Sequence, residues 1–217
     1  MQFKAVCFDL DGTLLDSLHD IAYCTNKVLI KWGLPSHNLE TIRKFVGEGL
    51  ENLITNSLPE KSRKKNLINE CQKDFQKIYR ETWFKNTTPY KEIPKLLDEL
   101  CKKRIKLAIL SNKPQEFVSL AVNRLLSNWK FELVLGQQND IPKKPNPDGF
   151  FLINKKLKLT PKEFALLGDT ETDMQTAVVA GCYPIGVLWG FRSEKVLIDN
   201  GAKIIIKEPL ELLDIIN

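Results

Sequence analysis

Two aspartates, Asp9 and Asp11, stand two positions apart directly after a short apolar run at residues 5–8. If that run is a β-strand, its extended backbone points both carboxylates to the same side, and Gly12 permits a sharp turn and the close approach of a ligand. Neighbouring carboxylates repel, so they need a cation between them or a shared proton. Because Mg²⁺ prefers hard oxygen ligands and commonly bridges carboxylates to phosphate, the pair suggests a magnesium and phosphate site. A pair of surface aspartates that ends a strand is the competing interpretation.

Further polar residues that suit such a site follow other apolar runs or lie in a proline-rich loop. A hydroxyl and an amide follow residues 107–110, a loop stiffened by prolines carries two lysines, and two more carboxylates follow residues 165–167. Ligands of open α/β sheets bind at the carboxyl ends of the strands, so these groups should converge with the two aspartates. In chain order they are Ser111, Asn112, Lys143, Lys144, Asp169 and Asp173.

The elements that must position these residues are predicted from hydrophobic patterning. Six near-continuous apolar runs predict buried parallel strands, at residues 5–8, 107–110, 133–135, 165–167, 185–188 and 203–206. Helical patterns separate most of them, which indicates a doubly wound, Rossmann-like α/β core. The alternation stops from about residue 17 to residue 84, where apolar residues recur only at helical spacing. We therefore expect a core at residues 1–15 and 87–217 and an inserted all-helical cap at residues 16–86.

The composition is that of a folded globular protein. Of the 217 residues, 43% are hydrophobic and 27% are charged. The longest apolar runs are far shorter than the roughly 20 residues of a membrane helix, and the N-terminal run lacks a signal-peptide pattern. Cys7, Cys71 and Cys101 fall at apolar-periodic positions, which predicts buried thiols in a reducing compartment. We therefore expect a cytoplasmic protein without a membrane partner.

The charge balance argues against a nucleic acid as partner. Lys and Arg number 32 against 27 Asp and Glu, which gives a formal charge of +5. The densest basic cluster, at residues 61–65, belongs to no reading motif, and a solvated helix face is its simpler interpretation. A mildly basic surface also suits a small anionic substrate.

The polar motifs occur in the order of the four motifs of the haloacid dehalogenase-like superfamily, which the chain resembles over essentially its whole length. They are Asp9-x-Asp11-Gly12-Thr13, Ser111, Lys144-Pro145 and Gly168-Asp169-x-x-x-Asp173. The helical insertion resembles the small cap of this superfamily. Residues 9–17 and the Val-Gly-Glu-Gly segment at 46–49 are similar to the phosphoglycolate phosphatase group. Pyrophosphatases, nucleotidases and sugar-phosphate phosphatases share much of the same pattern.

The resemblance implies three catalytic residues. Asp9 would attack phosphorus and form an aspartyl-phosphate. Asp11 would protonate the leaving oxygen and then deprotonate the water that hydrolyses the intermediate. Because the dehalogenases lack this second acid, phosphoryl transfer is favoured over carbon–halogen cleavage. Lys144, favoured over Lys143 by the Lys-Pro-x-Pro register, would counter the charge of Asp9 and the phosphoryl group.

The resemblance also implies the metal ligands. Asp9, Asp169 and the backbone carbonyl of Asp11 would hold Mg²⁺. Asp173 would support this metal shell from one helical turn further on, and a plain acid on a helix face is the alternative for it.

Phosphate and substrate contacts follow from the same resemblance. Thr13 and Ser111 would hydrogen-bond phosphate oxygens, with Asn112 as a further donor. The segment around residues 46–49 would be a cap loop that faces the active site, or else a simple turn between two cap helices. Its candidates for contact with the substrate are Arg43, Gly47 and Glu48.

The function expected from these residues is hydrolysis of a small phosphate monoester by a Mg²⁺-dependent phosphatase, with 2-phosphoglycolate as the first substrate. The alternatives within the superfamily are a pyrophosphatase, a nucleotidase, and a sugar-phosphate phosphatase or mutase. A phosphate-binding protein without catalysis is less favoured, because Asp9, Asp11, Lys144 and Asp169 are all present. The expected partner is a small phosphorylated metabolite, and the expected assembly is a monomer or a homodimer.

Overall fold

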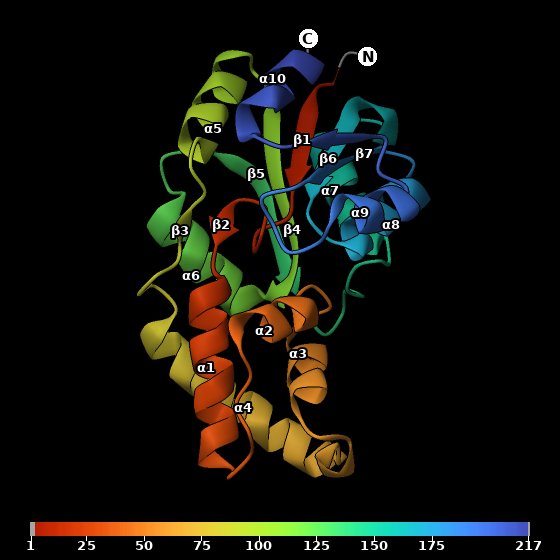
Figure 1. The fold of residues 1–217 in the computed structure, drawn as a ribbon. Helices are drawn as coiled ribbons and strands as arrows, with labels where there is room; N and C mark the ends of the chain where they lie inside the picture. The colour runs from red at the N-terminus through yellow and green to blue at the C-terminus, as the bar shows by residue number, and fades with distance from the viewer. Residues whose placement is uncertain (1–2, 217) are drawn as a thin grey trace.

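The computed structural model describes residues 3–216, which form an α/β core and a helical lobe beside it (Figure 1). The core contains a six-stranded parallel sheet in the order β5-β4-β1-β6-β7-β8. Its strands are β1 (Ala5–Phe8), β4 (Lys106–Pro114), β5 (Phe131–Gln137), β6 (Phe164–Gly168), β7 (Tyr183–Val187) and β8 (Ile204–Ile206). All six predicted strands are therefore present, and the prediction of a Rossmann-like α/β core is confirmed.

Helices cover both faces of this sheet, which explains the near-continuous apolar runs of its strands. Successive strand residues point to opposite faces. The core helices are α5 (Ile93–Lys102), α6 (Gln115–Leu125), α7 (Asp148–Leu157), α8 (Glu171–Ala180), α9 (Glu194–Asp199) and α10 (Leu212–Ile215). In β1, Val6 and Phe8 belong to one hydrophobic cluster with α5, α6 and α10, whereas Ala5 and Cys7 belong to a second cluster with α7 and α8.

The helical lobe consists of four helices that follow the first strand of the core. They are α1 (Leu18–Lys31), α2 (Leu39–Phe45), α3 (Leu50–Ser57) and α4 (Lys65–Thr82), and short 3-10 helices lie at Glu60–Ser62 here and at Pro161–Glu163 and Pro209–Glu211 in the core. Helices α1 and α4 pack against each other through apolar residues at helical spacing, such as Val28 and Phe75. The lobe lies over the carboxyl ends of β1 and β4, where the candidate residues were expected (Figure 1).

The chain passes between core and lobe twice, and a small ribbon joins the two crossings. Strand β2 (Leu15–Asp16) pairs antiparallel with β3 (Thr88–Pro89). The Asp20 carboxylate of α1 accepts hydrogen bonds from the backbone N–H groups of Asn86 at 2.9 Å and Thr87 at 2.8 Å. The sequence pattern predicted no strand pair here, because two-residue strands are too short to show a period. The expected domain boundaries, at residues 15/16 and 86/87, lie at this junction.

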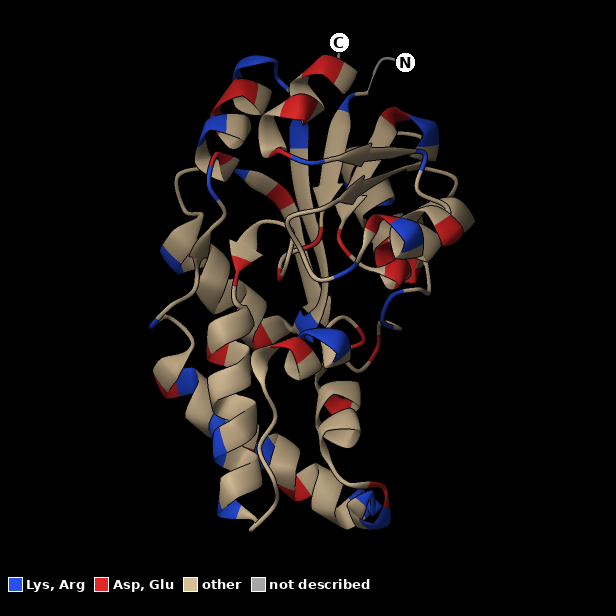
Figure 2. Cartoon of the chain, in the orientation of Figure 1, with Lys and Arg blue, Asp and Glu red and all other residues tan. Residues whose placement is uncertain are grey.

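The surface is mixed in charge, and one cysteine differs from expectation. Basic and acidic residues alternate over the helices of both lobe and core (Figure 2). Cys7 and Cys71 are buried as expected, but Cys101 is exposed. It lies near the end of α5, beside a buried stripe that ends at Leu100, so it falls on the solvent side of that helix. Within residues 3–216, no helix combines the length and the apolar character needed to span a membrane.

Candidate active site

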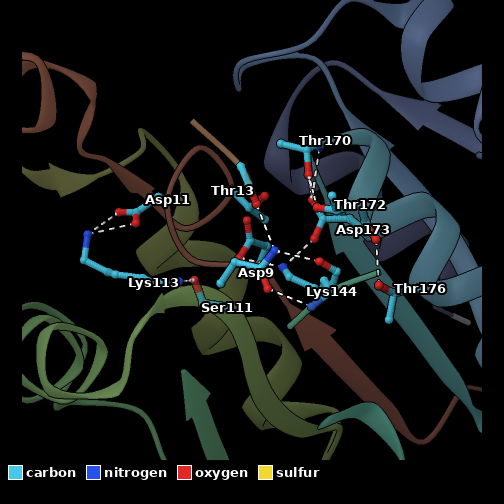
Figure 3. Close-up of polar contacts among 12 residues, drawn as sticks. Asp9, Asp11, Thr13, Ser111, Lys113, Lys144, Thr170, Thr172, Asp173 and Thr176 are labelled. Atoms are coloured by element: carbon cyan, nitrogen blue, oxygen red, sulfur yellow. Dashed lines mark hydrogen bonds and ion pairs between the residues drawn. The ribbon is translucent and has the colours of Figure 1, made fainter. Parts of the chain in front are cut away.

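Asp9 lies at the carboxyl end of the sheet, directly after β1. Its backbone N–H donates to the carbonyl of Leu167 in β6 at 2.9 Å, which continues the β1–β6 pairing by one residue. The Lys144 ammonium lies 2.9 Å from Asp9 Oδ1 and 2.6 Å from Asp173 Oδ1, and all three side chains are buried (Figure 3). Burial alone lowers the pKa of Lys144, but Asp173 and Asp9 together raise it above its ordinary value. Lys144 is therefore a fixed positive charge against Asp9.

Three carboxylates meet beside this lysine. Asp9, Asp169 and Asp173 each bring one oxygen within 4.8 Å of the others. Burial raises the pKa of Asp9 to about 6, with Lys144 opposing the shift, and burial together with the Asp9 charge raises the pKa of Asp169 well above its ordinary value. We call Lys144, Asp9, Asp169 and Asp173 the Lys144 cluster. Because it holds three acids and one cation, a divalent cation with a preference for oxygen ligands, such as Mg²⁺, fits its donor set.

The Asp169 carboxylate is fixed by two hydrogen bonds. Thr13 Oγ1 donates to Asp169 Oδ1 and the backbone N–H of Phe191 donates to Oδ2, each at 2.9 Å. Gly12 has a φ of +89°, and a Cβ atom on it or on Gly190 would collide with this carboxylate. The turn after β1 and the turn after β7 therefore both need glycine where they approach Asp169.

Asp173 is a buried acid and not a plain acid on a helix face. Its Oδ2 accepts from the Thr170 backbone N–H at 3.0 Å and from the Thr170 hydroxyl at 2.6 Å, which caps the start of α8. Its Oδ1 pairs with Lys144. Asp173 therefore holds Lys144 in place from the first turn of α8.

Asn112 ties three segments together. Its Oδ1 accepts from the Lys144 backbone N–H at 2.8 Å, and its Nδ2 donates to the carbonyls of Lys144 and Gly47, each at 3.0 Å. Both amide N–H groups are thus engaged, so in this structure Asn112 positions the Lys144 loop and offers no free donor to a phosphate. Lys143 turns the other way and donates to the Glu48 carbonyl at 2.7 Å. Of the two lysines, Lys144 reaches the aspartates.

The Asp11 carboxylate points away from the Lys144 cluster (Figure 3). Each of its oxygens lies 2.8 Å from Lys113 Nζ, and Ser17 Oγ donates to Oδ1 at 2.6 Å. Lys113 Nζ also donates to the hydroxyl of Tyr79 in α4 at 2.7 Å. Burial lowers the pKa of Lys113, but Asp11 and Tyr79 raise it above its ordinary value. We call Lys113, Asp11, Ser17 and Tyr79 the Lys113 cluster.

A cavity of about 60 Å³ lies between core and lobe, in front of Asp9. The core lines it with Asp9, Asp11, Ser111, Asn112 and Lys113, and the loop between α2 and α3 contributes Gly47 and Gly49. The remaining wall is mainly apolar and is formed by Ile21, Val46, Leu50, Leu53, Phe75, Tyr79, Pro114 and Phe117.

Two cap candidates, Arg43 and Glu48, stand outside this lining, as do the core candidates Thr13, Lys144, Asp169 and Asp173. Arg43 Nη2 lies 3.4 Å from Oε1 of Glu40 on the same helix, and the Glu48 carboxylate accepts a hydrogen bond from the Asn52 side chain. The loop that carries Glu48 does reach the cavity, because Gly47 and Gly49 line it.

The sequence reasoning did not place Lys113, Ser17 or Tyr79 beside Asp11. Lys113 follows Ser111 by two positions at the end of β4, so strand geometry points both side chains to the same side. That spacing was the available signal. No spacing in the sequence pointed to Ser17 or Tyr79. Ser17 meets Asp11, and Tyr79 meets Lys113, only through the fold.

Comparison with known proteins gives the family of this chain. The model of the haloacid dehalogenase-like hydrolase family matches residues 6–187. The phosphoglycolate phosphatase of Aquifex aeolicus is 34% identical over 188 residues, which cover 87% of this chain and 86% of that protein. The phosphoglycolate phosphatase of Photorhabdus laumondii is 30% identical and covers 91% of this chain and 86% of its own. A haloacid dehalogenase-like hydrolase from Streptococcus pneumoniae of known structure superposes with a TM-score of 0.89 at 26% identity, covering 99% of each chain.

These similarities extend over nearly the whole chain, core and helical lobe alike. The predictions of the superfamily, of its phosphoglycolate phosphatase-like group and of a phosphoric monoester hydrolase are thereby confirmed. The chain belongs to the haloacid dehalogenase-like hydrolases.

Proposed function

We propose that this hydrolase is a Mg²⁺-dependent phosphatase that cleaves 2-phosphoglycolate through an aspartyl-phosphate on Asp9. The observation that carries the proposal is the position of Asp9, which lies at the cavity with the Lys144 ammonium 2.9 Å from its carboxylate. The names of the relatives support the choice of substrate.

In the first step, an Asp9 oxygen forms a bond to phosphorus and the bond from phosphorus to the leaving oxygen breaks. Lys144 holds positive charge against the phosphoryl oxygens as negative charge develops on them. Ser111, which lines the cavity, donates a hydrogen bond to the phosphoryl group, whereas the Thr13 hydroxyl donates to Asp169 and holds that carboxylate in place. Asp11 gives a proton to the leaving oxygen, so the alcohol departs uncharged.

In the second step, a water molecule replaces the alcohol. Asp11, now a carboxylate, takes a proton from this water while the water oxygen attacks phosphorus. The bond between phosphorus and Asp9 breaks, which regenerates the carboxylate and releases inorganic phosphate. Asp11 thus needs two protonation states in one cycle.

Mg²⁺ bound by Asp9, Asp169 and the backbone carbonyl of Asp11 would neutralise the charge between Asp9 and the phosphate, and Asp173 would support it through Lys144. The raised pKa values of Asp9 and Asp169 support this assignment, because burial disfavours the charge of both carboxylates and a bound cation would offset that cost.

We infer that residues 16–86 form a cap that closes the site and selects the leaving group. The cap supplies most of the apolar wall of the cavity, and its loop carbonyl at Gly47 is bound to Asn112 of the core. Closure excludes bulk water, which strengthens the electrostatic interactions inside.

The five free thiols, four of them buried, support a cytoplasmic location.

The proposal is tested by phosphate release from 2-phosphoglycolate, pyrophosphate, nucleoside monophosphates and hexose phosphates, each with Mg²⁺ and with a chelator. We expect a Mg²⁺-dependent preference for 2-phosphoglycolate that Asp9→Asn abolishes. A preference for another ester would keep the chemistry and replace the substrate. Undiminished rates in chelator, or in the Asp9→Asn protein, would contradict the mechanism.

A further inference from the structure

The lobe side of the cavity, which would hold the leaving group, is lined mainly by apolar side chains. Helices α1, α3 and α4 surround it with Ile21, Leu50, Leu53 and Phe75. Among the residues of 3–216 that line the cavity, Lys113 is the one cationic side chain. An ammonium in such surroundings needs an anion as partner, because burial of an unpaired charge is costly. In this structure that anion is Asp11.

The pairing conflicts with the acid role of Asp11. Lys113 Nζ donates to both oxygens of this carboxylate at 2.8 Å, so neither oxygen is free to reach a leaving oxygen at Asp9. Ser17 donates a third hydrogen bond to the same carboxylate. To give a proton to the leaving oxygen, Asp11 must therefore separate from Lys113. Lys113 then needs another anion.

We propose that an anionic group on the leaving alcohol, a carboxylate in 2-phosphoglycolate, takes the place of Asp11 at Lys113 and so releases Asp11 to act as the acid. One anion replaces another, so the buried ammonium stays paired throughout. A neutral leaving group of the same size offers no such exchange. Lys113 is therefore both a specificity-determining residue for anionic leaving groups and a positioning residue for Asp11. This inference rests on the proposed phosphatase function.

Tyr79 connects this exchange to the helical lobe. Its hydroxyl lies 2.7 Å from Lys113 Nζ, and the ammonium lies 4.7 Å from the centre of its ring. These contacts keep the ammonium at the cavity wall when Asp11 leaves, because they come from α4 and not from the core strand. The substrate carboxylate thus meets a cation that the lobe holds in place.

The test compares 2-phosphoglycolate with ethyl phosphate, which has the same two-carbon leaving group without the carboxylate. For the wild-type protein we expect kcat/KM to be about 100-fold higher with 2-phosphoglycolate, the factor expected for one buried charged contact. Lys113→Met keeps the length of the side chain and removes the charge. It should reduce this ratio to within a few-fold of one, mainly through loss of activity on 2-phosphoglycolate.

A second variant and a second measurement guard against a folding defect. Lys113→Arg keeps the positive charge and should retain the preference for the carboxylate substrate. Glycolate should inhibit the wild-type protein competitively, and ethanol should not. Equal kcat/KM values for the two substrates in the wild-type protein, or an unchanged ratio in Lys113→Met, would overturn the inference while leaving a working phosphatase. Failure of the proposed function has a different signature, namely no Mg²⁺-dependent and Asp9-dependent phosphate release from any ester.

Discussion

The site contains two buried lysine–aspartate clusters that differ in charge and in origin. The Lys144 cluster is built wholly from core segments and sets three carboxylates against one ammonium. The Lys113 cluster pairs one ammonium with one carboxylate and joins the core to the lobe through Tyr79. The first is short of positive charge and suits a metal ion and a phosphoryl group. In the Lys113 cluster the two charges balance each other, and a competing anion must displace Asp11 from Lys113 before Asp11 can reach the leaving oxygen. The chemistry therefore belongs to the core, whereas selection of the leaving group belongs to the boundary between core and lobe.

The largest effects should separate the two aspartates, one from each cluster. Asp9→Asn should reduce kcat at least about 10⁴-fold with every phosphate ester, because the nucleophile itself is lost. Asp11→Asn should reduce kcat about 10³-fold with 2-phosphoglycolate, because the acid that protonates the leaving oxygen is lost. With p-nitrophenyl phosphate its first step should be largely preserved, since that leaving group departs without a proton. Rapid-mixing measurement of the p-nitrophenol burst checks this, and equal loss of the burst in both variants would contradict the division of roles.

The next effect concerns Lys144 and its neighbour. Lys144→Met should reduce kcat/KM about 10³-fold, because it removes the positive charge that faces the developing phosphoryl charge. Lys143→Met is the matched control, since its ammonium contacts the lobe at Glu48 and Asn52 and not the aspartates. We expect it to stay within a few-fold of the wild-type protein. Similar losses in both variants, measured on 2-phosphoglycolate, would contradict the assignment of Lys144.

The strand-end acids could be predicted because the signals are local. A short apolar run followed by Asp9 and Asp11, and another followed by Asp169, indicate buried parallel strands whose carboxyl ends meet at one edge of the sheet. The helical pattern around Phe75 and Tyr79 likewise predicted buried lobe residues, and both are buried.

The partners of Lys113 could not be predicted in this way. The Tyr79 hydroxyl reaches Lys113 across 34 positions, and Ser17 reaches Asp11 only because the turn after β1 brings it back. Periodicity reports which face of a helix is buried and is silent about the atom at the tip of the side chain. For the same reason Arg43 and Glu48 were candidates for the cavity, whereas the glycines between and beside them line it.

The excess of acid in the Lys144 cluster should appear in the stability of the metal-free protein. The pKa of Asp9 is about 6 in the folded protein and lower when unfolded, so the folded state binds more protons between these values. The free energy of unfolding should therefore fall as pH rises from about 4 to about 6, and Asp169 adds to the fall.

Bound Mg²⁺ should offset this loss, because it replaces the proton as the source of positive charge. We expect Mg²⁺ to raise Tm by roughly 5 °C near pH 7.5 and by less than half of that near pH 5, as measured by calorimetry. The Asp9→Asn protein should show a smaller shift near pH 7.5. An equal Mg²⁺ shift at the two pH values would show that the metal binds elsewhere.

The smallest effect tests whether the lobe contributes to selection through the Lys113 cluster. Tyr79→Phe keeps the ring against Phe75 and Phe117 and removes only the hydroxyl that accepts from Lys113. Loss of one hydrogen bond to a charged group that retains its main partner should lower kcat/KM for 2-phosphoglycolate about fivefold and leave ethyl phosphate nearly unaffected. Ile68→Ala is the packing control, because Ile68 is buried on the same helix outside the cavity lining and its truncation should lower Tm without changing the ratio of the two substrates. If both variants lower both activities equally, Tyr79 acts only as part of the lobe's hydrophobic core, and selection belongs to Lys113 alone.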